Sequence, residues 1–267
     1  MRNGSIQLLK ITDKSICIAE DRLRVECPWD RKQTNESLRA NTIEEVYELA
    51  GALLNDDAPN IKKELGDVLL HILFYSKIGD EQERFDIADV ADALNEKLIY
   101  RHPHIFGSVE ANDAATVKEN WEKLKLKEKG GNKTVLAGVP EALPAIIKAS
   151  RIQEKAANIG FDWEKKEDVW AKVKEEISEF SEEINGLSAE RMEAEMGDVL
   201  FSIINAARLY GINPENALEK TNRKFIRRFN HVERRCHEQG RELPDMTLAE
   251  MDALWNEAKT LEHESDN

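Results

Sequence analysis

Residues 175–198 read EEISEFSEEINGLSAERMEAEMGD, and residues 44–67 read EEVYELAGALLNDDAPNIKKELGD. Both stretches begin with Glu-Glu-x-x-Glu and end with Glu-x-Gly-Asp, and every matched position is displaced by 131 residues. Apolar residues recur at helical spacing on either side of a turn-forming centre, which predicts two helices joined by a short turn in each stretch. The chain is therefore predicted to contain an internal repeat of helical pairs.

The similarity between the halves continues beyond these stretches. Asn95-Glu96-Lys97 followed by Arg101 matches Asn222-Arg223-Lys224 followed by Arg228, and Trp121 matches Trp255. Between the halves, residues 129–144 read KGGNKTVLAGVPEALP, where Gly and Pro are concentrated and the helical periodicity stops. We expect a first domain over residues 1–130, a linker over 131–141 and a second domain over 142–267.

The composition favours an all-α protein. Of the 267 residues, 34% are charged and 41% hydrophobic, while only 13 are Gly and 7 are Pro. This balance suits helices with solvated outer faces and argues against disorder or turn-rich β architecture. Helical periodicity predicts helices over residues 36–55, 60–79, 86–101, 113–128, 143–157, 164–185, 188–211, 214–238 and 247–263.

Charge and cysteine content exclude several classes of protein. The net charge of −14 repels nucleic acid, so we do not expect a nucleic-acid partner. No apolar run approaches the roughly 20 residues of a membrane span, and the N-terminus lacks the features of a secretory signal. The three cysteines, Cys17, Cys27 and Cys236, are odd in number and far apart, which indicates neither disulfides nor a zinc ribbon. We expect a cytoplasmic protein with no membrane partner.

The repeated acids are candidate metal ligands. Residues three apart on a helix lie on one face, so two acids from each helix of a pair would converge if the helices are antiparallel. Carboxylates held this close repel one another unless cations lie between them, and an all-oxygen donor set favours Mg²⁺, which Mn²⁺ could replace. The predicted ligands of one to three ions are Glu176, Glu179, Glu195 and Asp198 in the second repeat, and Glu45, Glu48, Glu64 and Asp67 in the first.

Other readings of the same residues stay open. A Glu-Glu-x-x-Glu motif can be a solvated helix face, although its duplication argues against this. In the first repeat, Thr42 to Glu45 also fits a capping box at a helix start. Gly66 and Gly197 cost helix stability, which predicts either close helix approach or room for a metal. His71, which the second repeat replaces with Ser202, is interpreted as a hydrogen-bonded interior residue.

Cations for an anionic substrate are predicted on the helix that follows. Lys224 and Arg228 share a face at i and i+4 and could bind phosphate, although a solvated basic face is the alternative. Asn222 aligns with the apolar residues of this helix, so we expect it to point inward. Trp255 is interpreted either as a platform for a base or as a core residue.

Further motifs relate the chain to a known family. Residues 27–30 read CPWD, residues 101–106 read RHPHIF and residues 158–163 read NIGFDW. Together with the doubled acidic motifs, these strings resemble the MazG family of nucleoside triphosphate pyrophosphohydrolases over nearly the whole chain. The resemblance implies two tandem MazG-like helical-bundle domains, a homodimer, and Mg²⁺-dependent cleavage of nucleoside triphosphates to monophosphate and pyrophosphate.

The resemblance also assigns roles to residues. It implies that the second domain carries the activity and that the first is a dimerising, regulatory copy. Metal would bind at the four acids of the second domain, with Glu175 close by as a candidate general base. The implied substrate-contacting residues are Lys224, Arg228 and Trp255, together with Arg191, where the family has a lysine. The amide of Asn222, expected from its helix position to point inward, could bind a substrate or only the backbone.

Two other functions remain as alternatives. A related all-α enzyme restricted to one nucleotide, such as a dUTP-specific one, would share these features. A nucleic-acid-binding or regulatory protein would use the basic helix around residues 223–235 and leave the acids on its surface. A ferritin-like di-iron bundle is excluded because no His follows a Glu at Glu-x-x-His spacing.

Overall fold

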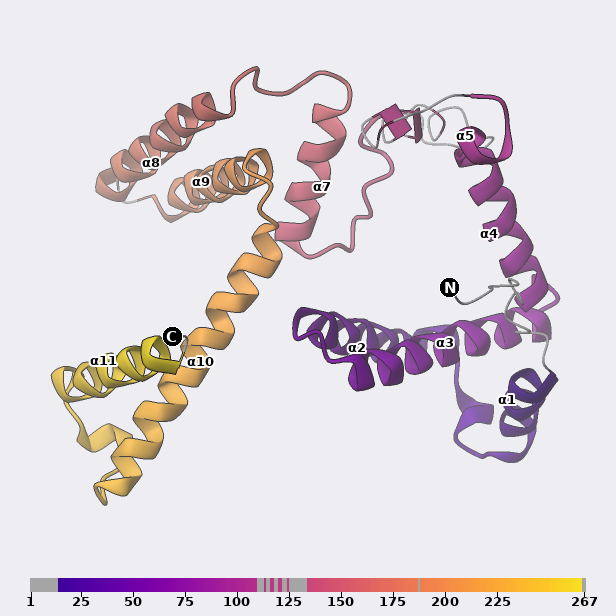
Figure 1. Ribbon diagram of the computed structural model, residues 1–267, viewed down its shortest axis with the longest axis horizontal. Helices are drawn as coiled ribbons and strands as arrows, with labels where there is room; N and C mark the ends of the chain where they lie inside the picture. The colour runs from indigo at the N-terminus through magenta and orange to yellow at the C-terminus, as the bar shows by residue number, and fades with distance from the viewer. Residues whose placement is uncertain are drawn as a thin grey trace. The chain divides into compact units, whose positions relative to one another are not determined.

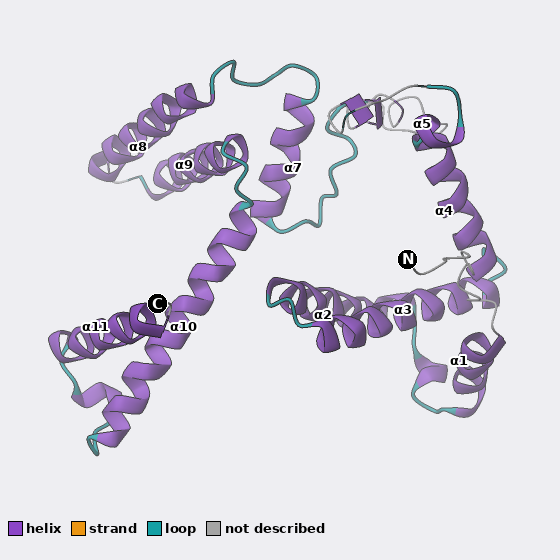
Figure 2. Ribbon diagram, viewed as in Figure 1, coloured by secondary structure: helices purple, strands orange, loops and turns teal. Residues whose placement is uncertain are grey.

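The computed structural model describes residues 14–109, 113, 116, 117, 120, 121, 124, 134–186 and 188–265. Within these residues the chain consists of helices and loops without a strand (Figure 2). The all-α prediction is therefore confirmed. The chain divides into two compact units, Met1–Leu124 and Lys125–Asn267, each described below by itself.

The first unit is built around one helical pair. Helix α2 (Asn35–Leu54) and helix α3 (Ala58–Glu81) are joined by a short turn in which Asp56 has a positive φ of 50°, and they pack side by side (Figure 1). In the described part of this unit, α1 (Lys14–Glu26) and α4 (Ile87–Arg101) contact α3, while η1 (Asp30–Lys32) contacts α1 and α5 (Pro103–Phe106) contacts α4.

The second unit repeats this arrangement and extends it. Helices α8 (Val169–Gly186) and α9 (Ala189–Leu209) form its central pair (Figure 1). Before them come α7 (Ala145–Ala157) and η2 (Lys166–Asp168). After them, the long α10 (Pro214–Glu238) leads through η3 (Leu243–Asp245) into α11 (Leu248–Ser265), which packs against α10.

The helix starts follow from local sequence. Thr34 caps α2, and its hydroxyl accepts from the Ser37 amide while the Ser37 hydroxyl accepts from the Thr34 amide. This reciprocal arrangement satisfies two amides that the helix leaves without partners. Ser188 caps α9, and Asn213 caps α10 directly before Pro214. Proline fits this position because its missing N–H is not needed there.

Each unit has its own small core. In the first unit, Leu38 of α2 packs with Phe74 and Ile78 of α3. The central pair of the second unit is held by Val169, Val173 and Ala206, and a separate cluster joins α10 to α11 through Val232, Cys236, Met246 and Leu254. None of the helices in the described residues is long and apolar enough to cross a membrane.

The predicted helices agree with the structure, with three exceptions. Helix α8 begins at Val169 and not at residue 164, because residues 166–168 form a 3₁₀ turn. Helices α1 and α5 were not predicted. Most of the predicted helix over 113–128 lies outside the described residues, as do residues 125–133, so the domain boundaries at 130 and 141 stay predictions.

Candidate functional site

Three acids meet in the second unit where α8 and α9 pack together. Glu176 and Glu179 of α8 and Glu195 of α9 each offer a carboxylate oxygen, and these oxygens all lie within 4.8 Å of one another. Glu176 is buried, with 8% of its surface exposed, whereas Glu179 is exposed. Loss of hydration, followed by the charge of Glu176, raises the pKa of Glu179 above its ordinary value. The side chains therefore form a concentrated negative site.

Lys172 partly neutralises this cluster. Lys172 lies one turn of α8 before these acids, and its ammonium is 2.8 Å from Glu175 Oε1 and 2.7 Å from Glu176 Oε1. The hydrogen bonds to Glu175 and then to Glu176 raise the pKa of Lys172. Lys172 thereby links the predicted general base Glu175 to a predicted metal ligand.

The first unit holds the corresponding cluster between α2 and α3. Oxygens of Glu45, Glu48 and Glu64 lie within 4.8 Å of one another. Burial, followed by the charge of Asp67, raises the pKa of Glu45. Glu64 is 5% exposed, and its Oε2 is buried without a hydrogen-bond partner among the described residues. A buried carboxylate oxygen in this state is stabilised by a cation or a donor.

Lys63 distinguishes the first cluster from the second. Its ammonium lies 2.9 Å from Glu64 Oε1, 3.5 Å from Asp67 Oδ2 and 3.9 Å from Glu48 Oε2. The matching position in the second repeat is Ala194, which carries no charge. The two clusters therefore share their acids but differ in their internal cations.

The fourth predicted ligand of each repeat lies at the edge of its cluster. Asp67 and Asp198 are not among the acids whose oxygens lie within 4.8 Å of one another, although Asp198 lines the same cavity as Glu176. The prediction that four carboxylates converge therefore holds for three of them in each unit.

Close helix approach is not the reason for the glycines between the acids. A Cβ built at Gly66 or Gly197 would meet no atom within 4 Å beyond the backbone of its own helix. That interpretation is wrong within the described residues of one chain. The space beside both glycines is open, but each is two residues from a clustered acid, Glu64 or Glu195, and so points to another side of its helix.

The alternative capping role in the first repeat is wrong. Thr42 lies inside α2, where its hydroxyl donates to the Leu38 carbonyl at 3.0 Å, because the helix already begins at Asn35. The Thr42 hydroxyl also lies 3.1 Å from His71 Nδ1. His71 is buried, so its interpretation as a hydrogen-bonded interior residue is confirmed.

The predicted phosphate-binding residues lie on α10 and contact α11. Arg228 donates to Glu262 at 2.8 Å and stands over the Trp255 ring at 5.7 Å from its centroid. Lys224 is exposed and forms no ion pair within the described part of the chain. The first unit repeats the stacking, since Arg101 stands over Trp121 at 5.4 Å.

Trp255 combines the two interpretations given to it. It packs against the cluster of Val232 and Leu254 and contacts Phe225 at a centroid distance of 4.9 Å. Its side chain is only partly buried, so part of the indole remains accessible beneath Arg228.

Asn222 does not point inward as predicted. It is exposed, and Phe225 and Ile226 on the same face are each 56% exposed. Phe225 and Ile226 of α10 therefore remain accessible to solvent within the described part of a single chain. Arg191 is likewise exposed, and its guanidinium lies 3.8 Å from Glu183.

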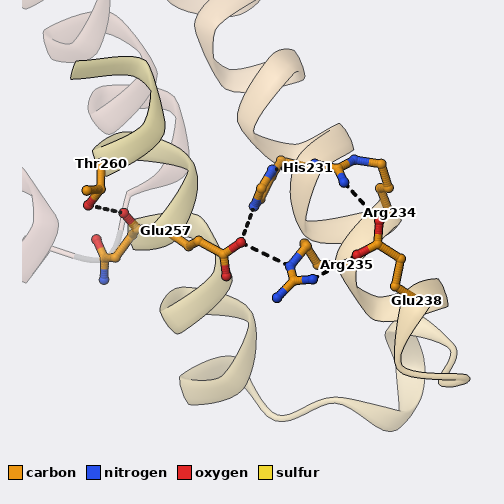
Figure 3. Close-up of polar contacts among 7 residues, drawn as sticks. His231, Arg234, Arg235, Glu238, Glu257 and Thr260 are labelled. Atoms are coloured by element: carbon orange, nitrogen blue, oxygen red, sulfur yellow. Dashed lines mark hydrogen bonds and ion pairs between the residues drawn. The ribbon is translucent and has the colours of Figure 1, made fainter. Parts of the chain in front are cut away.

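Helices α10 and α11 are joined by a polar network as well as by their core (Figure 3). Glu257 of α11 points towards α10, where its Oε1 lies 3.1 Å from His231 Nε2 and 3.0 Å from Arg235 Nε (Figure 3). Arg234 and Arg235 both donate to Glu238. These contacts fix the relative position of Arg228 and Trp255 on the two helices.

Among the described residues, no contact joins Lys224, Arg228 or Trp255 to the clustered acids of α8 and α9. The ion pairs of the acids run to Lys172 on α8, whereas those of Arg228 run to Glu262 on α11. A single chain therefore assembles the predicted metal ligands and the predicted phosphate ligands as two separate groups.

A cavity of about 980 Å³ adjoins the acids of the second unit. Glu176 and Asp198 form part of its wall, and its other sides come from residues 134–136, α7, the loop before η2, and α9. The loop contributes Phe161, Asp162 and Trp163 of the NIGFDW motif. The acids thus border a space large enough for an organic ligand.

Several residues of this region were not predicted. Lys172 and Lys63 could have been found because each lies four residues before a repeated acid, Glu176 and Asp67, a spacing that permits an ion pair. Gln153, which lines the cavity from α7, has no such signal, because its burial depends on how α7 packs against α9.

Comparison with known proteins agrees with this geometry. The family model described as the MazG nucleotide pyrophosphohydrolase domain matches residues 33–106 and 164–233, which contain the two acidic clusters. The chain is 42% identical over 234 residues, 87% of this chain and 89% of the relative, to "Nucleoside triphosphate pyrophosphohydrolase/pyrophosphatase MazG" of Thermotoga maritima.

Two further relatives cover similar shares of the chain. "Nucleoside triphosphate pyrophosphohydrolase" of Escherichia coli K12 is 38% identical over 240 residues, 88% of this chain and 91% of the relative. "Uncharacterized protein YabN" of Bacillus subtilis is 48% identical over 241 residues, 90% of this chain and 49% of the relative. With a family match in each helical unit and relatives that align over most of its length, the chain belongs to the MazG family.

Proposed function

We propose that this protein hydrolyses nucleoside triphosphates to nucleoside monophosphate and pyrophosphate, with the acidic cluster of α8 and α9 as its active site. The observation that carries the proposal is the convergence of Glu176, Glu179 and Glu195 beside an organic-sized cavity. The names of the relatives from T. maritima and E. coli support the same activity.

The residues present fit magnesium. Each cluster offers carboxylate oxygens only, the donor type that hard divalent cations prefer. In the first unit, the buried and unpartnered Oε2 of Glu64 is the kind of atom that a cation would stabilise. In the second unit, the ligands would be Glu176, Glu179, Glu195 and Asp198. When bound, Mg²⁺ or Mn²⁺ would neutralise phosphate charge and lower the pKa of water.

The chain's own residues supply the remaining chemistry. Glu175, whose Oε1 lies 2.8 Å from the Lys172 ammonium, or one of the ligand acids would accept the proton of a water that attacks the α-phosphorus. Lys172 would also keep Glu175 oriented next to Glu176. Lys224 and Arg228 would neutralise the charge that develops on the departing pyrophosphate, with Arg228 exchanging Glu262 for phosphate.

A homodimer would bring the two groups of residues together. The apolar side chains Phe225, Ile226 and Phe229 of α10 are 39–56% exposed, and exposed apolar stripes of this kind mark contact surfaces. A second copy of the chain covering this face could place its acids opposite Lys224 and Arg228. The proposed assembly thus accounts for the separation of the two groups within one chain.

Nucleic acid is a poorer candidate ligand for α10. Most of the cations on this helix already pair with acids: Arg223 with Glu219, Arg228 with Glu262, and Arg235 with Glu238 and Glu257. The protein's own acids neutralise these cations, and the net charge of −14 repels a polyanion. A gel shift with DNA or RNA in the absence of Mg²⁺ would support this alternative.

The product and the site of attack test the proposed reaction. The purified protein is incubated with each nucleoside triphosphate in H₂¹⁸O, with and without Mg²⁺. We expect pyrophosphate, and ¹⁸O in the monophosphate, only when Mg²⁺ is present. Orthophosphate as the first product, or ¹⁸O in pyrophosphate, would contradict attack at the α-phosphorus. Turnover of dUTP alone would favour the nucleotide-specific alternative.

Matched variants locate the reaction. Glu176→Gln should reduce turnover at least about 100-fold, because it removes a buried ligand from the cluster. Glu193→Gln makes the same change at an exposed position of α9 and should leave turnover unchanged. Glu45→Gln tests the first unit, which we propose binds a cation and regulates the activity of the second unit. The cytoplasmic location stays a prediction.

A further inference from the structure

The guanidinium of Arg228 on α10 is covered by an acid from α11. Its Nε donates to Glu262 Oε2 at 2.8 Å, and its Nη2 lies 2.8 Å from the same oxygen. The side chains of Arg228 and Glu262 are only 13% and 28% exposed. One carboxylate oxygen therefore occupies an edge of the guanidinium that a phosphate oxygen would also bind.

Glu262 is held in this position from several sides. Arg227, the residue before Arg228, places its Nη2 3.4 Å from Glu262 Oε1. The hydrogen bond from Arg228 lowers the pKa of Glu262, so that the carboxylate is ionised at neutral pH. The contact of Glu257 with His231 holds α11 against α10 further along the two helices (Figure 3). The helices therefore stay together even when Glu262 leaves Arg228.

The neighbouring cation Lys224 lies one turn earlier on the same face of α10 and is not covered in this way. It is exposed and takes part in no ion pair in the portion of the chain that the structure describes. Trp255 lies against Arg228, with its ring centroid 5.7 Å from the guanidinium carbon, but carries no charge that competes for an anion. An anion thus reaches Lys224 directly, whereas it reaches the Nε edge of Arg228 only by displacing Glu262.

The strength of the ion pair determines how strongly Glu262 competes. Measured ion pairs at exposed positions change an equilibrium constant by up to about fivefold. The pair of Arg228 and Glu262 is less exposed and shares two N–H groups, so we expect an effect of about three- to tenfold. A competitor of this strength weakens the binding of a phosphate group without abolishing it.

We propose that Glu262 is a built-in competitor for the phosphate site at Arg228. It yields the guanidinium to the pyrophosphate end of a nucleoside triphosphate and takes it back when pyrophosphate leaves, so that the product is bound weakly and released readily. This inference rests on the proposed function for the identity of the anion. It adds a regulation of that site by the chain itself, in which a carboxylate and the product alternate on one cation.

Inorganic pyrophosphate tests the competition without hydrolysis. Isothermal titration calorimetry in the presence of Mg²⁺ measures its Kd for the full chain and for Glu262→Gln, which keeps the shape of the side chain but removes its charge. We expect the Kd to fall about three- to tenfold in the variant, because pyrophosphate no longer displaces a charged competitor. If Glu262 instead orients Arg228 for the anion, the Kd rises, and that result would overturn the inference.

Two controls separate this effect from a general loss of negative charge. Glu264→Gln removes the same charge at an exposed position two residues away on α11 and should change the Kd less than about twofold at physiological ionic strength. In an Arg228→Gln background, Glu262→Gln should have no effect, because the cation for which it competes is absent. Equal tightening in Glu264→Gln or in the Arg228→Gln background would overturn the inference.

Glu262→Asp provides a second variant that keeps the charge but shortens the side chain by one methylene group. This change withdraws the carboxylate from Arg228, so the Kd of pyrophosphate should again fall. Circular dichroism and urea unfolding check that each variant is folded. Unchanged pyrophosphate binding in folded Glu262→Gln and Glu262→Asp would show that Glu262 does not compete for Arg228.

The outcomes separate the inference from the proposed function. A chain that hydrolyses nucleoside triphosphates but binds pyrophosphate equally with and without the charge of Glu262 would keep the proposed function and overturn the inference. Tighter binding of pyrophosphate by Glu262→Gln in a protein without pyrophosphohydrolase activity would sustain the inference and refute the proposed function. In an active protein, the inhibition constant of pyrophosphate should fall in Glu262→Gln by the same factor as the Kd.

Discussion

Glu195→Gln should make the protein more stable without divalent cations and less responsive to them. An oxygen of Glu195 lies within 4.8 Å of oxygens of the buried Glu176 and of Glu179. Two unit charges at this separation repel by about 0.9 kcal/mol in water and by roughly four times as much near a protein surface. Because Lys172 offsets part of the charge of Glu176, we expect a gain of about 1 kcal/mol from that pair.

The cation response should change in the opposite direction. A ligand present at 100 times its Kd stabilises the folded state by about 2.7 kcal/mol. Glu195→Gln should lose most of this gain, because it removes one of the converging oxygens. The measurement is urea unfolding followed by circular dichroism, in EDTA and in saturating Mg²⁺. A Glu45→Gln background removes the contribution of the first cluster.

The control for this experiment lies on the same helix. Glu193 is exposed and two residues from Glu195, so that it faces another side of α9. Glu193→Gln should change neither the stability in EDTA nor the effect of Mg²⁺. If Glu195→Gln behaves like Glu193→Gln, the acids are solvated surface residues and the metal site does not exist.

Three further changes test other parts of the structure. Lys63→Met should increase the Mn²⁺ affinity of the first cluster about two- to fivefold, because the ammonium 2.9 Å from Glu64 Oε1 no longer competes with the cation for the carboxylates. Electron paramagnetic resonance titrations measure this affinity, and an unchanged affinity would contradict the prediction. Burial, followed by the charge of Asp21, raises the pKa of Glu20 to about 7 from its ordinary value of 4.5. Between these two pH values, Glu20 is protonated in the folded state but ionised in the unfolded state. Stability should therefore fall as the pH rises from about 4.5 to about 7, and Glu20→Gln should remove this fall and add about 2 kcal/mol at pH 8; parallel pH profiles of the urea midpoint would refute it. Leu38→Ala should cost about 3 kcal/mol in urea unfolding, since Leu38 is 1% exposed against Phe74 and Ile78, and a cost below about 1 kcal/mol would show that this cluster does not hold the first unit.

The helices could be predicted because their signals are local. Asn213 before Pro214 and Ser188 before α9 mark helix starts within a few residues of sequence. Helical spacing likewise predicts that Glu176 and Glu179 share a face, and the short turn between α8 and α9 brings Glu195 to them. The predicted start of α8 at residue 164 was wrong because residues 166–168, which continue the helical periodicity, form a 3₁₀ turn.

The remaining features depend on packing between distant segments. Periodicity shows that Asn222 shares a face with Phe225, but it does not show whether the chain covers that face. The cavity needs α7, the NIGFDW loop and α9 together, and these join through contacts such as Arg208 with Asp162, 46 residues apart. The burial of Gln153 on α7, whose Nε2 donates to the Phe201 carbonyl, appears only once this packing is known.

The open space beside Gly66 and Gly197 has a consequence for engineering this enzyme family. Alanine at either position would meet no obstacle within 4 Å and would strengthen its helix by about 1 kcal/mol. A search for heat-resistant variants would therefore select these substitutions early. Each glycine is two residues from a clustered acid, Glu64 or Glu195, so the added methyl group would point to another side of the helix and should leave the acids undisturbed. Heat-resistant variants of this kind should therefore keep their catalytic rate.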